Sequence, residues 1–134
     1  MSNKRELRLE QFDRAVKGLE ESLAEKKTVI TRNSSILCFI LAYELAWKAL
    51  KEELERGGKE INAPREALRE GFQEGLLGED PLWMETLVFR NEAMHTYAEP
   101  LAEELYGVLS DVLKLYKDLL KRLKSRESSS RNGA

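Results

Sequence analysis

The sequence predicts an all-α protein: an antiparallel up-and-down bundle of four main helices plus one short helix, assembled as a dimer. Apolar residues recur at alternating spacings of three and four in several segments, which is the period of a helix with one buried face. Of 134 residues, 34% are charged, while only 8 are Gly and 3 are Pro, as expected for helices that show charge to water. No segment has the period of a strand, so the helices must bury their apolar faces against one another.

The first predicted helix covers residues 4–26. Its apolar face consists of Leu9, Phe12, Val16, Leu19 and Leu23. Charged residues fill its other faces, which predicts a helix at the surface of the bundle with one buried side.

The second predicted helix is the longest apolar one. It follows a polar break in which Thr31, Asn33 and Ser34 are candidate N-caps, and Gly57-Gly58 ends it. Its apolar residues lie on more than one side and include Ile36, Leu37, Ile40, Leu41 and Trp47. Such a helix is either central in the bundle or faces a second subunit.

Prolines mark the starts of the remaining helices. Pro64 is expected to open a short helix that ends near Gly75, and Pro81 a helix that reaches Met94 or His95. Pro100 is expected to open the last helix, which carries Leu101, Leu105, Val108, Leu109, Val112, Leu115 and Leu119. Residues 125–134 have no apolar period and predict a disordered, basic and Ser-rich tail, so residues 1–124 form the single domain.

The charge balance excludes several classes of protein. With 22 basic and 24 acidic residues, the net charge of -2 provides no global attraction to nucleic acid or to an anionic membrane. We therefore expect no DNA binding, and any RNA contact must be local. The only cysteine, Cys38, is expected to be a small buried apolar residue rather than a nucleophile. The N-terminus has no apolar signal region and the longest apolar run, 36–43, is too short to span a bilayer, so a cytoplasmic location is expected.

The only histidine, His95, lies in the segment 90–97, from which a chemical role can be argued. On a helix, Arg90, Asn91 and His95 share an arc with Trp83, Met84, Leu87, Val88 and Met94, opposite Glu85, Thr86 and Glu92. Polar groups on an apolar face cost free energy unless partners or a cleft receive them.

Two interpretations of this arc remain open. In the structural one, Asn91 and His95 form a polar pair beside a subunit interface, while Arg90 pairs with a carboxylate of another helix. In the functional one, the imidazole is a general acid or base and the guanidinium binds a phosphate of RNA. One histidine supplies too few ligands for zinc, so no metal site is expected. A metal-free ribonuclease often needs both a base and an acid, so a histidine nuclease with this sequence would place its site across a homodimer interface.

Arg90-Asn91, three residues, then His95-Thr96-Tyr97 resembles the Arg-x4-His-x-Tyr motif of the HEPN superfamily. The resemblance is to the branch of nucleotidyltransferase substrate-binding proteins, which includes HepT-like toxins. It covers residues 7–123 and extends to the blocks 43–51, 64–70, 83–97 and 102–106. One block differs, because Leu37-Cys38-Phe39-Ile40 stands where members often carry the polar Gln-Arg-Phe-Glu.

The resemblance implies a homodimer whose paired motifs line a cleft, encoded beside a minimal nucleotidyltransferase. In toxin members, the residues that correspond to Arg90 and His95 support cleavage of RNA without a metal or another cofactor. Asn91 also matches the motif and is expected to orient His95. The nucleotidyltransferase neutralises the toxin by adding AMP to the tyrosine that corresponds to Tyr97. The alternative is a non-catalytic subunit that presents a substrate or nucleotide to the transferase.

Overall fold

The computed structural model describes residues 3–95 and 98–133, with side chains as far as residue 126. The α-helices are α1 (Lys4–Ala24), α2 (Val29–Arg56), α3 (Pro64–Gln73), α4 (Leu82–Glu92) and α5 (Glu99–Gly133), and a 3-10 turn, η1 (Ala93–His95), follows α4. The part of the chain that the structure describes contains no strand.

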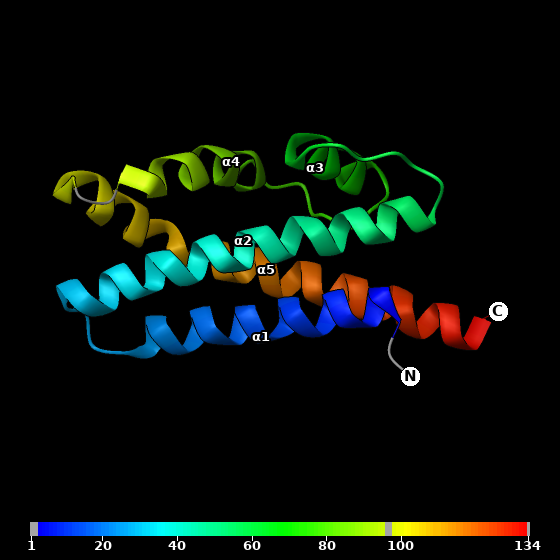
Figure 1. The fold of residues 1–134 in the computed structure, drawn as a ribbon, viewed down its shortest axis with the longest axis horizontal. Helices are drawn as coiled ribbons and strands as arrows, with labels where there is room; N and C mark the ends of the chain where they lie inside the picture. Colours follow the sequence, from blue (N-terminus) through cyan, green and yellow to red (C-terminus); the bar gives the residue numbers. More distant parts are fainter. Residues whose placement is uncertain (1–2, 96–97, 134) are drawn as a thin grey trace.

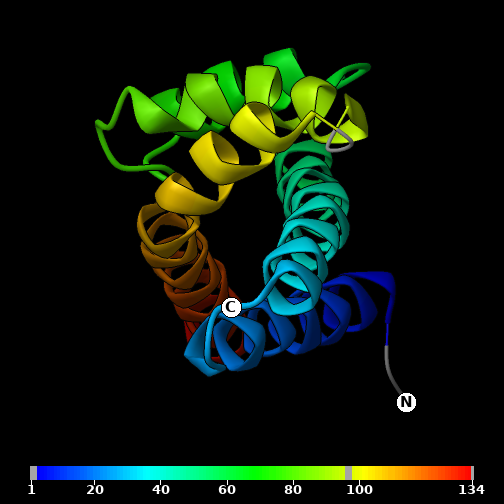
Figure 2. The same cartoon turned by 90° about the vertical axis from the view of Figure 1, so that its left-hand side faces the viewer.

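Three long helices and two short ones make up the bundle. Helices α1, α2 and α5 lie side by side, while α3 and α4 follow one another along the bundle and together occupy the fourth position (Figure 1). Seen from one end, the helices enclose a common core (Figure 2). The chain direction alternates from α1 to α2, to the α3 and α4 pair, and to α5, which confirms the predicted all-α up-and-down bundle.

The start of α2 corrects the sequence prediction. The cap is Thr28, whose hydroxyl accepts a hydrogen bond from the Thr31 backbone N–H at 3.1 Å, while the Thr31 hydroxyl accepts one from the Thr28 N–H at 2.7 Å. Asn33 and Ser34, offered with Thr31 as N-caps, lie inside the helix. This reciprocal capping box satisfies two backbone donors and moves the start of the helix to Val29. The predicted end is confirmed, since α2 stops at Arg56 and Gly58 has φ +94°.

The proline signals locate the other starts closely. Pro64 is the first residue of α3, and α5 begins at Glu99, next to Pro100. Before α4, the Asp80 carboxylate accepts a hydrogen bond from the Leu82 N–H at 2.9 Å. These positions are typical because proline's missing N–H costs nothing in the first turn of a helix.

The core contains side chains from all five α-helices. Tyr116 of α5 is fully buried, with its ring centroid 5.9 Å from that of Phe12 in α1 and 5.7 Å from that of Trp83 in α4. The largest fully buried side chains are Phe12, Leu19, Phe39, Leu50, Ile61, Leu76, Leu105, Leu109, Val112, Tyr116, Leu119 and Leu123. By length and composition alone, α2 is long and apolar enough to cross a membrane, but a helix in the core of a bundle meets the same criteria.

The C-terminal end of α5 differs from the prediction. The sequence predicts that the helix ends near Lys124 and that residues 125–134 are disordered, whereas α5 continues as a helix to Gly133. The apolar period stops at Leu123, but neither glycine nor proline follows until Gly133. Arg126 also donates a hydrogen bond to the backbone carbonyl of Glu74, so the helix is held against the turn after α3 beyond Leu123.

Candidate functional site

Arg90 lies in the last turn of α4 and pairs with α2. Its side chain is 28% exposed, and its Nε donates a hydrogen bond to Oε1 of Glu44 at 3.2 Å. The other carboxylate oxygen of Glu44 accepts a hydrogen bond from the indole N–H of Trp47, also at 3.2 Å. The terminal guanidinium nitrogens of Arg90 make no hydrogen bond to any described residue. Among the described residues, Arg90 is thus held through one nitrogen, and none of them uses the donors of its two terminal nitrogens.

Glu44 was missed as a site residue by sequence reasoning, although it lies in a segment that carries the family resemblance. Its neighbour Tyr43 is buried, and burial raises the pKa of the Tyr43 hydroxyl to about 12, with a further contribution from Glu44 that Arg90 opposes. Tyr43 therefore stays neutral throughout the physiological range. The spacing of Glu44 and Trp47, three residues apart on one helix face, was the available signal for their contact.

His95 lies in η1, the turn that directly follows α4. It is the last residue of η1, its side chain is exposed, and its backbone carbonyl accepts a hydrogen bond from the Ala98 N–H at 3.0 Å. Asn91 is also exposed, and its backbone carbonyl accepts a hydrogen bond from the Ala93 N–H. The orienting role of Asn91 stays a prediction. Tyr97, the expected site of modification, lies outside the described residues, as does Thr96.

The predicted apolar arc of α4 is only partly buried in the single chain. Trp83, Thr86 and Ala93 are the buried residues, whereas Met84 and Val88 are exposed along with Asn91 and His95. Thr86 was assigned to the polar side, but its hydroxyl donates to the carbonyl of Trp83 at 2.6 Å, so it is buried without an unpaired group. Asn91 and His95 consequently face away from the core.

Exposed apolar side chains also lie on α2. Leu37 is 57% exposed and Leu41 is 54% exposed, and Met94 of η1 is 62% exposed. Helices α2 and α4 run in opposite directions (Figure 1), and the Arg90–Glu44 pair joins them. Moving from Arg90 toward Met94 therefore corresponds to moving from Glu44 back toward Leu41 and Leu37. We call Leu37, Leu41 and Met94 the apolar seam.

The segment that departs from the family pattern contributes to both sides of α2. Phe39 is fully buried and Ile40 is partly buried against the core, while Leu37 belongs to the apolar seam. Cys38 is partly buried, and desolvation raises the pKa of its thiol despite a hydrogen bond with Ser22 that lowers it. Its thiol is thus a poor nucleophile at neutral pH, as the sequence predicts.

A charge network beside the motif was not foreseen. Arg32 is only 2% exposed, and its terminal nitrogens donate to the two carboxylate oxygens of Glu99 at 2.6 and 3.0 Å and to Glu103 at 3.0 Å. These hydrogen bonds raise the pKa of Arg32 and lower that of Glu99; Lys27 and then Arg32 lower the pKa of Glu103. The network fixes the first turn of α5 directly after the motif. The sequence offered one signal that Arg32 is buried: it stands four positions before Ile36, on the same face of the helix.

The remaining charged groups provide neither a metal site nor a basic surface. Within residues 3–95 and 98–126, no three His, Cys, Asp or Glu side chains are grouped so as to hold a metal ion. Most cations of α5 form ion pairs with acidic residues of the same chain; for example, Lys117 pairs with Glu20 and Lys124 with Asp13.

Comparisons with known proteins agree with this architecture. Residues 7–125 match the family model described as nucleotidyltransferase substrate binding protein like. A protein of Haemophilus influenzae named probable ribonuclease HepT is 31% identical over 93 residues, a match that covers 66% of this chain and 64% of that protein.

Two solved structures share the fold. A protein of Thermus thermophilus has a TM-score of 0.79 and 31% identity, covering 84% of this chain and 98% of that one. A Haemophilus influenzae protein, described as having the fold of a substrate binding domain of a nucleotidyltransferase, has a TM-score of 0.73 and 25% identity, covering 87% and 98%.

The fold and the family match together thus define an all-α, HEPN-type protein. More specifically, the chain belongs to the nucleotidyltransferase substrate binding protein-like family, in its HepT-like group. The resemblance found in the Arg90-to-Tyr97 motif is confirmed.

Proposed function

We propose that this protein is the toxin of a toxin–antitoxin pair, an endoribonuclease that works as a cytoplasmic homodimer without a metal ion. The observation that carries the proposal is the state of Arg90. Glu44 holds its Nε, while both terminal nitrogens make no hydrogen bond to described residues, five positions before an exposed His95. A guanidinium fixed in this way presents a planar pair of donors, which suits a phosphate.

The proposed reaction needs two histidines, and a two-fold dimer provides them. The ribose 2'-oxygen attacks the adjacent phosphorus while its proton passes to one His95 acting as the base. The bond from phosphorus to the 5'-oxygen breaks, and the His95 of the second copy donates a proton to that oxygen. Arg90 stabilises the negative charge that develops on the phosphoryl oxygens.

The apolar seam supports the pairing of two copies. Leu37 and Leu41 of α2 and Met94 of η1 are each more than half exposed. Exposed apolar groups gathered in this way favour a protein–protein interface. Pairing through the seam would bring two copies of Arg90 and His95 together.

The partner in this proposal is a minimal nucleotidyltransferase that acts as the antitoxin. It would transfer AMP from ATP to the Tyr97 hydroxyl, with release of pyrophosphate, and so place a bulky anion two residues from His95. Such an anion would compete with the RNA phosphate for Arg90. Incubation with the transferase and ATP followed by mass spectrometry should find AMP on Tyr97, and AMP on another residue would contradict this step.

Cleavage is tested with unmodified protein in a chelator. We expect His95→Ala to abolish RNA cutting and to leave the dimer intact, whereas Glu85→Ala, an exposed substitution on α4, should cut like the wild type. Retained cutting by His95→Ala would refute the role of His95. Light scattering after gel filtration tests the seam: Leu37→Glu should yield monomers, while Leu7→Glu on α1, at a side chain that is 47% exposed, should remain dimeric.

A second candidate function is favoured by the family itself. The solved Haemophilus protein is described as a substrate binding domain of a nucleotidyltransferase, so this chain would present a substrate or nucleotide to a transferase, with Arg90 and His95 gripping a phosphate. This function predicts that unmodified protein leaves RNA whole in the cleavage assay and still binds the transferase.

A further inference from the structure

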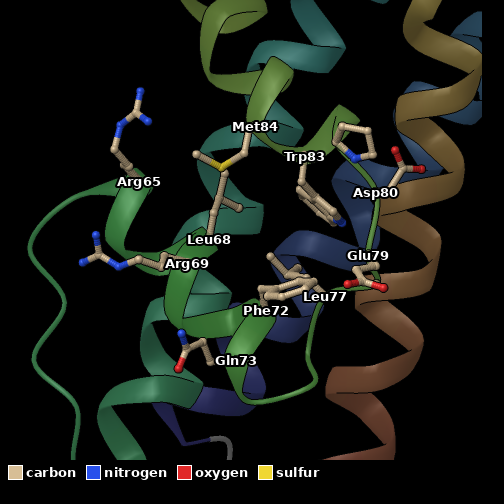
Figure 3. Close-up of a pocket in the computed structure, with 12 residues that line it drawn as sticks. Arg65, Leu68, Arg69, Phe72, Gln73, Leu77, Glu79, Asp80, Trp83 and Met84 are labelled. Atoms are coloured by element: carbon tan, nitrogen blue, oxygen red, sulfur yellow. The ribbon is translucent and has the colours of Figure 1, made fainter.

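A cleft separate from the Arg90 and His95 motif opens between α3 and α4. It has a volume of about 500 Å³, within the range of small-molecule sites. Its floor is apolar, because Leu68, Leu77 and Trp83 are buried, and Phe72 and Met84 stand at its sides partly exposed (Figure 3). The polar groups at its edge are Arg65, Arg69, Gln73, Glu79 and Asp80.

The cleft is held open by the backbone of the turn after α3. The positive φ of Gly75, +77°, reverses the chain there, and the backbone N–H groups of Leu76 and Leu77 both donate to the carbonyl of Gly71. From α5, Arg122 donates to the carbonyl of Gly75 at 3.0 Å. These contacts fix the turn, so the cavity is preformed. Ligand binding therefore costs little conformational entropy.

Charge is divided between two rims of the cleft. Arg65 and Arg69 lie four residues apart on α3 and extend on one side of the apolar floor, whereas Glu79 and Asp80 lie on the opposite side (Figure 3). The Arg65 guanidinium forms no ion pair or hydrogen bond with any residue that the structure describes. Arg69 has only a 4.0 Å contact with Glu70. Two guanidinium groups at one rim are therefore available to an anion.

The acidic rim is less available. Oδ1 of Asp80 accepts a hydrogen bond from the Leu82 N–H at the start of α4, so its charge also stabilises that helix end. An anion in the cleft is repelled from Glu79 and Asp80 and attracted toward α3. The two rims thus orient a charged ligand across the apolar floor.

We propose that this cleft binds an aromatic anion, with its flat ring against Trp83 between Phe72 and Met84 and its anionic group at Arg65 and Arg69. The aromatic and methionine side chains suit a flat apolar body. The two guanidinium groups suit a carboxylate, a sulfonate or a phosphate. The site is separate from the proposed cleavage and dimer sites, since neither Arg90, His95 nor any residue of the apolar seam lines it.

The test uses a matched pair of fluorescent probes. 1-Anilinonaphthalene-8-sulfonate is an aromatic anion, and N-phenyl-1-naphthylamine has the same rings without the charge. We expect the sulfonate to bind the wild-type protein at one site and Arg65→Gln/Arg69→Gln to weaken that binding by about tenfold or more, the scale of a charged hydrogen bond. The neutral probe should bind both proteins alike. Phe72→Ala should weaken the binding of both probes.

Two controls separate the cleft from general effects. Arg8→Gln/Arg14→Gln removes the same charge from α1 and should leave sulfonate binding unchanged. All the substituted arginines are at least partly exposed, and circular dichroism melting checks that each variant folds. Equal sulfonate binding by wild type and Arg65→Gln/Arg69→Gln would overturn the proposal, as would equal affinity of the wild type for both probes, which indicates an apolar docking surface for a protein.

Competition then distinguishes the natural sources of an aromatic anion. Displacement of the sulfonate by AMP would support a nucleotide, and displacement by indole-3-acetate would support an aromatic carboxylate. Displacement by neither at millimolar concentration would overturn the assignment.

Discussion

Tyr116→Phe should stabilise this protein. The Tyr116 side chain is fully buried at the centre of the bundle, and its hydroxyl has no hydrogen-bond partner. Phenylalanine keeps the ring and therefore its contacts with Phe12 and Trp83 at 5.9 and 5.7 Å. The substitution removes only a polar group that folding has taken out of water without compensation.

The magnitude follows from the cost of that burial. A buried polar group without a partner costs about 1–3 kcal/mol. Because removal of the hydroxyl also removes some of its packing contacts, we expect a net gain near the lower limit, about 1 kcal/mol in the free energy of unfolding. For a chain of this size, that gain corresponds to a rise in Tm of about 3–5 °C.

Urea unfolding followed by circular dichroism measures the change, with a thermal melt as a second reading. Tyr106→Phe is the matched control, since Tyr106 is on the same helix but partly exposed, and it should be nearly neutral. A loss of stability of about 1 kcal/mol in Tyr116→Phe would refute the reasoning. It would mean that a water molecule in the adjacent void, about 10 Å³ in volume and also lined by Tyr43 and Thr86, completes the hydroxyl's hydrogen bonds.

Two further predictions concern pH. Burial raises the pKa of Tyr43 to about 12 and that of Tyr116 well above its ordinary value of 10.0, so their contribution to stability is complete below pH 10 and is lost as the pH rises through the folded values. Unfolding free energies that stay constant up to about pH 11.5 would contradict this. The Arg32 guanidinium lowers the pKa of Glu99 below its ordinary value of 4.5. The stability that the ionised Glu99 carboxylate contributes is therefore complete above pH 4.5 and is lost as the pH falls toward the pKa of Glu99 in the folded protein. Melts between about pH 5 and 3 should therefore show a smaller loss for Glu99→Gln than for the wild type, and equal losses would count against the ion pair.

The apolar periods determined most of the fold. The stripe of Leu9, Phe12, Val16 and Leu19 is buried as predicted, and the prolines located the starts of α3 and α5. These features are local, because the helix period and proline chemistry act within one or two turns. The same holds for the Arg90-to-Tyr97 motif, which indicated the family before any contact was known.

Contacts between residues far apart in the sequence could not be predicted from these local features. The pairing of Arg90 with Glu44 joins residues 46 positions apart, and Arg32 with Glu99 joins residues 67 apart. A charge pattern along the chain indicates that partners are needed but does not choose among 24 acidic residues. The arc of α4 was misassigned for the same reason, since its period does not tell which apolar side faces the core and which faces outward.

The sequence by itself predicted a helical bundle of the HepT-like family and indicated Arg90, Asn91, His95 and Tyr97 as the candidate site residues. Only the tertiary structure decided that Glu44 holds the Nε of Arg90, that no described residue bonds its terminal nitrogens, and that His95 lies exposed. It also decided that α3, α4 and the turn between them enclose a cleft. The physical reason is that helix formation depends on neighbours in sequence, whereas pairing and concavity depend on how the helices pack.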